Sequence, residues 1–71
     1  MRDLTVNARL RAVMERKRKK QTALSRAAGI RYQSLHRAVN GRRPIYADEL
    51  LPLCRALGVG PEALLGPVRD D

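Results

Sequence analysis

This sequence has few aromatic residues, one cysteine and few acidic residues in its first half. Its 71 residues include two tyrosines, no tryptophan and no phenylalanine, so its aromatic content is 3%. Strands are enriched in aromatic and β-branched residues, and the β-branched residues here never alternate over the length of a strand. We therefore expect no β-sheet. The shortage of aromatic side chains also predicts a modest free energy of unfolding, about a few kcal/mol.

The single cysteine excludes an intramolecular disulfide. Cys54 falls on one helical stripe with Leu50, Leu53 and Leu57, which predicts a buried structural residue. No apolar run approaches the length of about 18 residues that a membrane span needs, and the N-terminus has no apolar signal-peptide core. We therefore expect a cytoplasmic protein.

The charges are unevenly distributed along the chain. Lysine and arginine total 15 against 7 aspartate and glutamate residues, which gives a net charge of +8. The segment from Arg9 to Arg43 holds 12 basic residues and one acidic residue, Glu15, whereas residues 44–71 hold two basic and five acidic residues. This asymmetry indicates one surface that faces nucleic acid and another that is turned away from it.

The spacing of apolar residues predicts one all-α domain over residues 1–71, with a core at about 4–65 and a tail at 66–71. The expected helices cover about 3 or 5 to 18, 21–28, 32–40, 47–57 and 61–65. Asp3 is a candidate N-cap of the first helix. Pro52 should kink the fourth helix or delay its start to Asp48, and Pro61 should occupy the first position of the fifth.

Residues 21–41 form two short helical patterns separated by Gly29, which can take the positive φ that ends a helix. The inward side chains expected from this segment are Leu24, Ala27, Ala28, Ile30, Leu35, Ala38 and Val39. Gln33 and Arg37 lie opposite Leu35 on the second pattern, one turn apart. Amide and guanidinium groups in this arrangement suit a helix that reads the DNA major groove.

A longer set of residues supports this interpretation. It comprises Leu10, Gln21, Leu24, Gly29, Ile30, Leu35, Asn40-Gly41, Leu50, Leu53, Leu57-Gly58-Val59 and Leu64-Leu65. In the spacing of these residues the chain resembles the phage Cro and lambda-repressor-like helix-turn-helix family. The resemblance implies a compact five-helix lambda-repressor-like DNA-binding domain. It also implies two-fold dimers or paired monomers on operator DNA, with the helix at 32–40 in the major groove.

Three departures from the family pattern affect the prediction. Met14 and Val39 stand where the family often has an arginine–glutamate pair, which predicts a packed apolar contact in place of an ion pair. Lys19 and Lys20 replace the apolar residue and the N-cap before the second helix, so the first helix runs on or the junction is looser. Arg31 replaces the serine or threonine cap of the third helix. This costs roughly 1 kcal/mol but places a cation where it can meet a phosphate.

The expected DNA contacts fall into two groups. The expected base contacts are Tyr32, Gln33, His36 and Arg37, because arginine suits guanine, glutamine suits adenine and Tyr32 can pack on a thymine methyl. The expected phosphate contacts are Lys20, Gln21, Arg31, Ser34, Asn40, Arg42 and Arg43. The resemblance further implies that Gln21 braces the first residues of the third helix. The basic run at residues 16–20 should add long-range attraction to DNA.

We expect no enzyme activity, since the sequence has no nucleophile–base constellation, carboxylate pair or glycine-rich phosphate loop. We also expect no cofactor and no metal, because His36 is the only histidine. The favoured function is a sequence-specific transcriptional regulator, a small phage or prophage Cro-type repressor that blocks a promoter. It would bind a pseudo-palindromic operator in double-stranded DNA as a weak homodimer, and the 71 residues leave no room for a sensing or self-cleavage domain.

Two alternatives stay open. One is an antitoxin-type protein-interaction module with a DNA-binding half, whose contact edge would be Leu64, Leu65, Pro67 and Val68. The other is a restriction-modification controller protein. A toxin-like reading frame beside the gene would favour the antitoxin, and a divergent repressor gene would favour the Cro role.

Overall fold

Five helices make up the structure, a computed structural model that describes residues 5–66. They are α1 (Thr5–Lys17), α2 (Gln21–Ala28), α3 (Tyr32–Val39), α4 (Ala47–Leu57) and α5 (Glu62–Leu65). Residues 5–66 contain no strand, which agrees with the expected all-α fold. No helix in this range is long and apolar enough to cross a membrane. The candidate N-cap Asp3 and the tail residues 67–71 lie outside the described residues.

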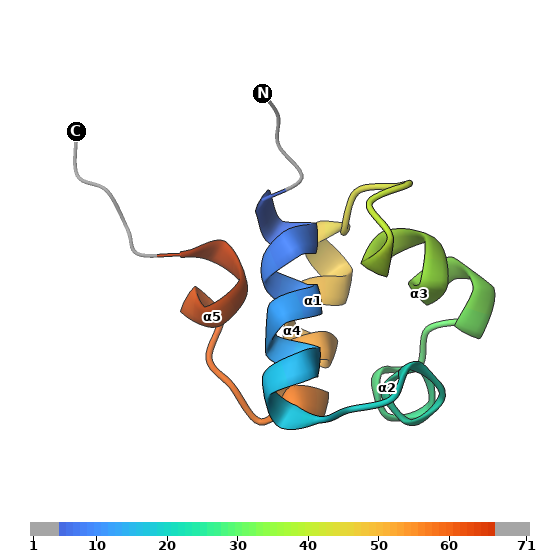
Figure 1. Ribbon diagram of the computed structural model, residues 1–71, viewed down its shortest axis with the longest axis horizontal. Coiled ribbons are helices and arrows are strands. Elements are labelled where there is room, and N and C mark those ends of the chain that lie inside the picture. The colour runs from blue at the N-terminus through green and yellow to red at the C-terminus, as the bar shows by residue number, and fades with distance from the viewer. Residues whose placement is uncertain (1–4, 67–71) are drawn as a thin grey trace.

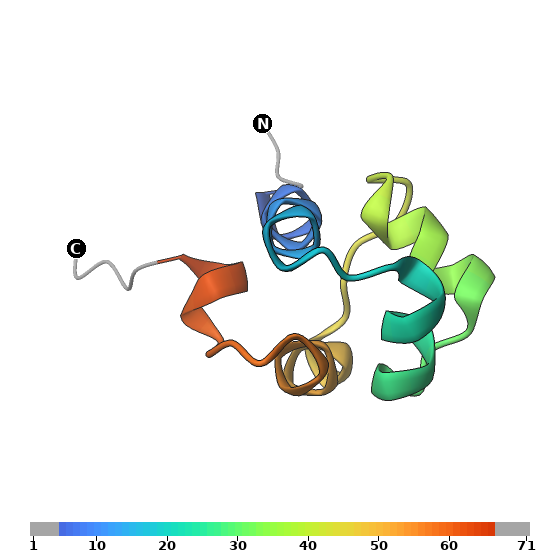
Figure 2. The same cartoon turned by 60° about the horizontal axis from the view of Figure 1, so that its bottom comes forward.

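Helices α1 and α4 occupy the centre, with α5 on one side and α2 and α3 on the other (Figures 1 and 2). Where the helices meet, each contributes one fully buried leucine: Leu10, Leu24, Leu35, Leu53 and Leu64. Burying a leucine stabilises a fold by roughly 1.5–3 kcal/mol, so this leucine layer provides a core without large aromatic rings. The predicted burial of Cys54 is confirmed, and burial raises the pKa of its thiol.

The turn between α2 and α3 depends on Gly29. Its φ of 70° lies in the left-handed region, where a side chain would be strained. The N–H of the next residue, Ile30, donates to the carbonyl of Ser25 at 3.0 Å, which closes the end of α2. The predicted hinge is confirmed.

The junction between α1 and α2 is a defined turn, and α1 does not run on. Arg18 adopts a φ of 56°, and the N–H of Lys19 donates to the carbonyl of Met14 at 2.9 Å. This is the same closing pattern as at Gly29, but it uses an arginine. A non-glycine residue in the left-handed region costs roughly 1–2 kcal/mol, so the junction forms at some conformational cost.

Three predicted helix boundaries differ from the structure by one residue. α1 ends at Lys17, one residue before the predicted end, and α3 ends at Val39, with Asn40 as its C-cap. α4 covers the predicted range Ala47–Leu57 and continues through Pro52, so the delayed start at Asp48, one of the two effects expected of this proline, does not occur. α5 begins at Glu62, although Pro61 already has helical φ and ψ angles of −59° and −29°.

The inward face of α2 was assigned partly wrongly, because Ala27 is exposed and Ser25 is buried. At about 100° per residue, Ala28 and Ser25 follow Leu24 around one side of the helix, and Ala27 falls on the other. The Ser25 hydroxyl donates to the carbonyl of Thr22 at 2.9 Å, so its burial leaves no unsatisfied donor.

Asn7 is a buried polar residue that the sequence analysis missed. Its side chain is 4% exposed, and its Nδ2 donates to the carbonyls of Ala38 at 2.7 Å and Arg43 at 2.8 Å. One amide group therefore attaches α1 to the end of α3 and to the loop that follows.

Two of the four residues predicted for the antitoxin edge are described. Leu64 is fully buried, whereas Leu65 is 55% exposed. Gly66, the first residue of the predicted tail, is buried, and the Arg9 guanidinium lies against it. Pro67 and Val68, the other residues of the antitoxin edge, lie outside the described residues.

Candidate nucleic-acid interface

The outward face of α3 carries the side chains predicted to read bases. Tyr32, Gln33, His36 and Arg37 are exposed, whereas Leu35, the residue opposite Arg37 and Gln33, is fully buried. The four exposed side chains line a shallow hollow of about 410 Å³. Burial on one face thus leaves amide, guanidinium and ring groups available on the other.

The helix starts beside this face have no capping side chain. Lys20 precedes α2 and Arg31 precedes α3, and neither makes a side-chain cap hydrogen bond. Both residues are exposed. The first N–H groups of a helix and its dipole attract anions, and here a cation stands at each of these helix starts. The weak cap predicted at Arg31 is therefore present, and its place is suited to a phosphate.

A polar network joins α2 to α3. His36 Nδ1 lies 3.1 Å from Gln21 Oε1, and His36 Nε2 lies 3.2 Å from Asn40 Nδ2. The His36 ring also stacks on Tyr32, with 6.1 Å between ring centroids. Gln21 thus braces the fifth residue of α3, whereas the resemblance implied bracing of its first residues. Both ring nitrogens of His36 already have protein partners, so the ring is less suited to contact a base.

Arg43 has a structural role that the sequence analysis did not predict. Its two terminal nitrogens form a bidentate pair with the Glu49 carboxylate, at 2.9 and 3.0 Å. Its Nε donates to the carbonyl of Ser34 and its Nη1 to that of Pro44, and the guanidinium lies 5.1 Å from the centroid of the Tyr46 ring. Since its side chain is only 10% exposed, we withdraw Arg43 from the phosphate contacts.

The carboxylate partner of Arg43 also closes the start of α4. Glu49 accepts the N–H of Tyr46 at 3.0 Å, and its own N–H donates to the Tyr46 carbonyl at 2.9 Å. Burial by itself raises the pKa of Glu49. The hydrogen bonds from Arg43 and Tyr46, with the charge of Arg43, outweigh burial and leave that pKa below its usual value.

Ser34 lies away from the base-reading face. It is half-buried and lines a hollow of about 330 Å³ between the α2–α3 turn and the start of α4. Asp48 and Glu49 line the same hollow. Arg31 lines this hollow too, and the Glu49 charge is paired with Arg43, so the carboxylates alone do not exclude a phosphate. We withdraw Ser34 from the phosphate contacts because it is half-buried and lies off the exposed face of α3, whereas Arg31 is exposed. Arg42, next to Arg43 in sequence, is exposed and keeps its predicted assignment.

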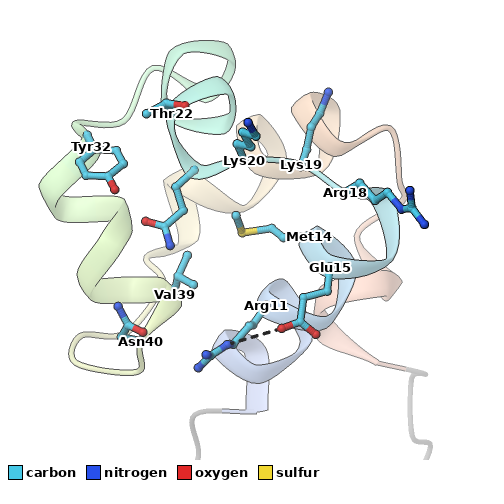
Figure 3. Close-up of a pocket in the computed structure, with 11 residues that line it drawn as sticks. Arg11, Met14, Glu15, Arg18, Lys19, Lys20, Thr22, Tyr32, Val39 and Asn40 are labelled. Carbon is cyan, nitrogen blue, oxygen red and sulfur yellow. Dashed lines mark ion pairs between the residues drawn. The ribbon is translucent and has the colours of Figure 1, made fainter.

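A larger hollow of about 600 Å³ separates the end of α1 from α2 and α3 (Figure 3). Met14 from α1 and Val39 from α3 line it, and both also belong to the buried core. Lysine and arginine side chains around it are Arg11, Arg18, Lys19 and Lys20. Glu15 is the one carboxylate among the lining residues, and it pairs loosely with exposed Arg11 at 3.9 Å. The hollow adds positive potential beside the start of α2.

Residues 9–70 match the family model for the Cro/C1-type HTH DNA-binding domain. The chain belongs to this family. The match covers the helix-turn-helix and the helices that support it, and it confirms the family resemblance seen in the sequence. Membership in this family indicates that the chain is a DNA-binding transcriptional regulator. No curated protein and no solved structure matched the chain.

Met14 and Val39 stand where the resemblance implied an ion pair between α1 and α3. They are 5% and 7% exposed and belong to one buried apolar cluster. Apolar side chains at both positions avoid the cost of desolvating two charges.

Proposed function

We propose that this Cro/C1-type domain is a sequence-specific repressor, which binds a pseudo-palindromic operator as a weak homodimer and blocks a promoter. The observation that carries the proposal is the exposed face of α3 flanked by two uncapped helix starts, at Lys20 and Arg31. Such an arrangement can place one helix in the major groove and hold phosphates on either side of it.

The proposed contacts follow from exposure and chemistry. Arg37 would pair with guanine and Gln33 with adenine, while the stacked ring of Tyr32 would pack on a thymine methyl. The proposed phosphate contacts are Lys20, Gln21, Arg31 and Arg42. With three cations in each subunit, a dimer would neutralise about six phosphates, so log K should fall with log salt at a slope near −5.

Two arginines with different proposed roles test this function. Arg37→Ala should weaken binding to the operator by about 1–3 kcal/mol and relax the preference at one base pair in each half-site. Arg42→Ala should weaken binding to operator and random duplex alike, and should reduce the salt slope by about one per subunit. The operator can be located by DNase I footprinting of DNA that flanks the gene.

Competition binding to the operator, its single-base variants and random duplex separates the two roles. Arg55→Ala is the matched control, because Arg55 is an exposed arginine on α4, in the acidic part of the sequence that is expected to face away from DNA. If Arg37→Ala loses the same factor on every duplex, α3 does not read the sequence. A wild-type salt slope shallower than about −2 would contradict DNA binding itself.

A further inference from the structure

The polar network of Gln21, His36 and Asn40 has only one consistent direction of hydrogen bonding. Asn40 lies 2.9 Å from the main-chain carbonyl of His36 through its Nδ2. A carbonyl only accepts, so the amide atom facing it must be the nitrogen. The opposite amide orientation would place two oxygens at this distance.

This constraint extends to both nitrogens of the imidazole ring. The same Asn40 Nδ2 lies 3.2 Å from His36 Nε2, so Nε2 must accept and carry no proton. The proton of the neutral ring then lies on Nδ1, which donates to Gln21 Oε1 at 3.1 Å. The orientation of one asparagine amide therefore determines both the tautomer of His36 and the amide orientation of Gln21.

The side-chain amides of Gln21 and Asn40 differ in the hydrogen-bonding groups that they can still offer to DNA. Gln21 is the first residue of α2, whose N-terminus has no side-chain cap. Because its Oε1 accepts from His36, both protons on its Nε2 can be donated to an acceptor on another molecule. Asn40 donates both of its amide protons within the protein, so the atom it has left to offer is Oδ1, an acceptor. A phosphate accepts hydrogen bonds, so it suits Gln21 and does not suit the Asn40 side chain.

We propose that His36 is a positioning residue, which holds Gln21 as a hydrogen-bond donor to a DNA phosphate and does not itself contact a base. The proposal rests on the DNA-binding function proposed above. It removes His36 from the base contacts, and the Asn40 side chain from the phosphate contacts, that the sequence predicted. Stacking on Tyr32 keeps the ring in the plane that the two hydrogen bonds require.

The tautomer can be tested in the free protein, independently of any DNA. Long-range ¹H–¹⁵N spectra at about pH 8, where histidine is ordinarily neutral, distinguish the protonated ring nitrogen from the unprotonated one. We expect the proton on Nδ1. Asn40→Ala removes the donor to Nε2 and should let the Nε2–H form appear. A majority of the Nε2–H form in the wild type, or an unchanged spectrum in Asn40→Ala, would overturn the proposal.

A double-mutant cycle tests what the network does in DNA binding. Gln21→Ala should weaken binding to random duplex about tenfold, the value of one hydrogen bond to a charged group. His36→Phe keeps an aromatic ring over Tyr32 but removes both hydrogen bonds, and should weaken operator and random duplex equally, by about threefold. The double variant should bind little worse than Gln21→Ala alone, because His36 acts through Gln21.

Gln33→Ala is the control for a base contact, and its loss should be confined to the operator. The proposal fails if His36→Phe behaves in the same way, with losses on the operator alone that multiply with those of Gln21→Ala. Failure of the wild type to bind duplex DNA would instead refute the proposed function, whatever tautomer the spectra show.

Discussion

The sharpest prediction about stability concerns Asn7, because its side chain joins α1, the end of α3 and the loop that follows α3. It donates to the carbonyls of Ala38 and Arg43 from a site that is 4% exposed. Each hydrogen bond contributes about 1 kcal/mol, and an acceptor left buried without a partner costs about 1–3 kcal/mol. The Ala38 carbonyl also accepts the N–H of Gly41 at 3.1 Å, so the Arg43 carbonyl should bear most of this loss.

Asn7→Ala should therefore lower the free energy of unfolding by about 2–3 kcal/mol, which corresponds to roughly 10–20 °C in Tm for a domain of this size. Asn7→Asp should be worse near neutral pH, because it has the same shape but turns a carboxylate toward two carbonyls. Burial against two carbonyls raises the pKa of this carboxyl, so stability should return as the pH falls through the raised value and be fully regained by about pH 4, since a protonated carboxyl can again donate one hydrogen bond.

Thermal and urea melts over a range of pH test both substitutions. Arg11→Ala is the control on the same helix, since an exposed arginine with a 3.9 Å ion pair should contribute under about 1 kcal/mol. An Asn7→Ala variant as stable as this control would show that the two hydrogen bonds do not hold α1 to the end of α3. An Asn7→Asp variant whose stability does not rise as the pH is lowered would lead to the same conclusion.

Two further predictions concern charge in the core and beside it. The lowered pKa of Glu49 means that its contribution to stability is complete above about pH 4.3 and is lost as the pH falls through the folded-state value. Glu49→Gln should flatten this acid limb in melts measured against pH, and an unchanged limb would contradict the pairing with Arg43. Met14→Arg should destabilise the fold by about 2 kcal/mol or more, because it buries an unpaired charge beside Val39, and adding Val39→Glu should recover part of the loss. Strictly additive losses in thermal melts would show that these two side chains do not interact.

The core could be predicted well from the sequence. Leu24 and Leu35 were placed correctly because burial of a large apolar side chain depends mainly on residue type and helical spacing. The errors occurred at small residues, whose burial has a weaker driving force. Ala27 and Ser25 differ little in size, and the way α2 packs against both α4 and α3 decides which of them faces the core.

The polar residues were harder to predict, because each has more than one possible partner. Asn7 interrupts an apolar pattern and carries no signal in an analysis of hydrophobic periodicity. His36 and Asn40 are one turn apart, so a contact between them could be expected from helical spacing. Their orientation depends on Gln21, which another helix supplies only after the chain has folded.

Arg42 and Arg43 show that the number of basic residues in a segment does not say which of them can bind DNA. The two residues are adjacent and chemically identical, and the sequence assigns both to phosphates. Folding brings the Glu49 carboxylate and the carbonyl of Ser34 to one of them, and the side chain of Arg43 is 10% exposed as a result. An arginine with paired charge and occupied donors attracts DNA little, whereas an exposed one keeps its full effect. The positive field at the interface therefore comes from exposed cations that no carboxylate of residues 5–66 pairs with. Lys20, Arg31 and Arg42 describe such a surface better than the net charge of the segment does.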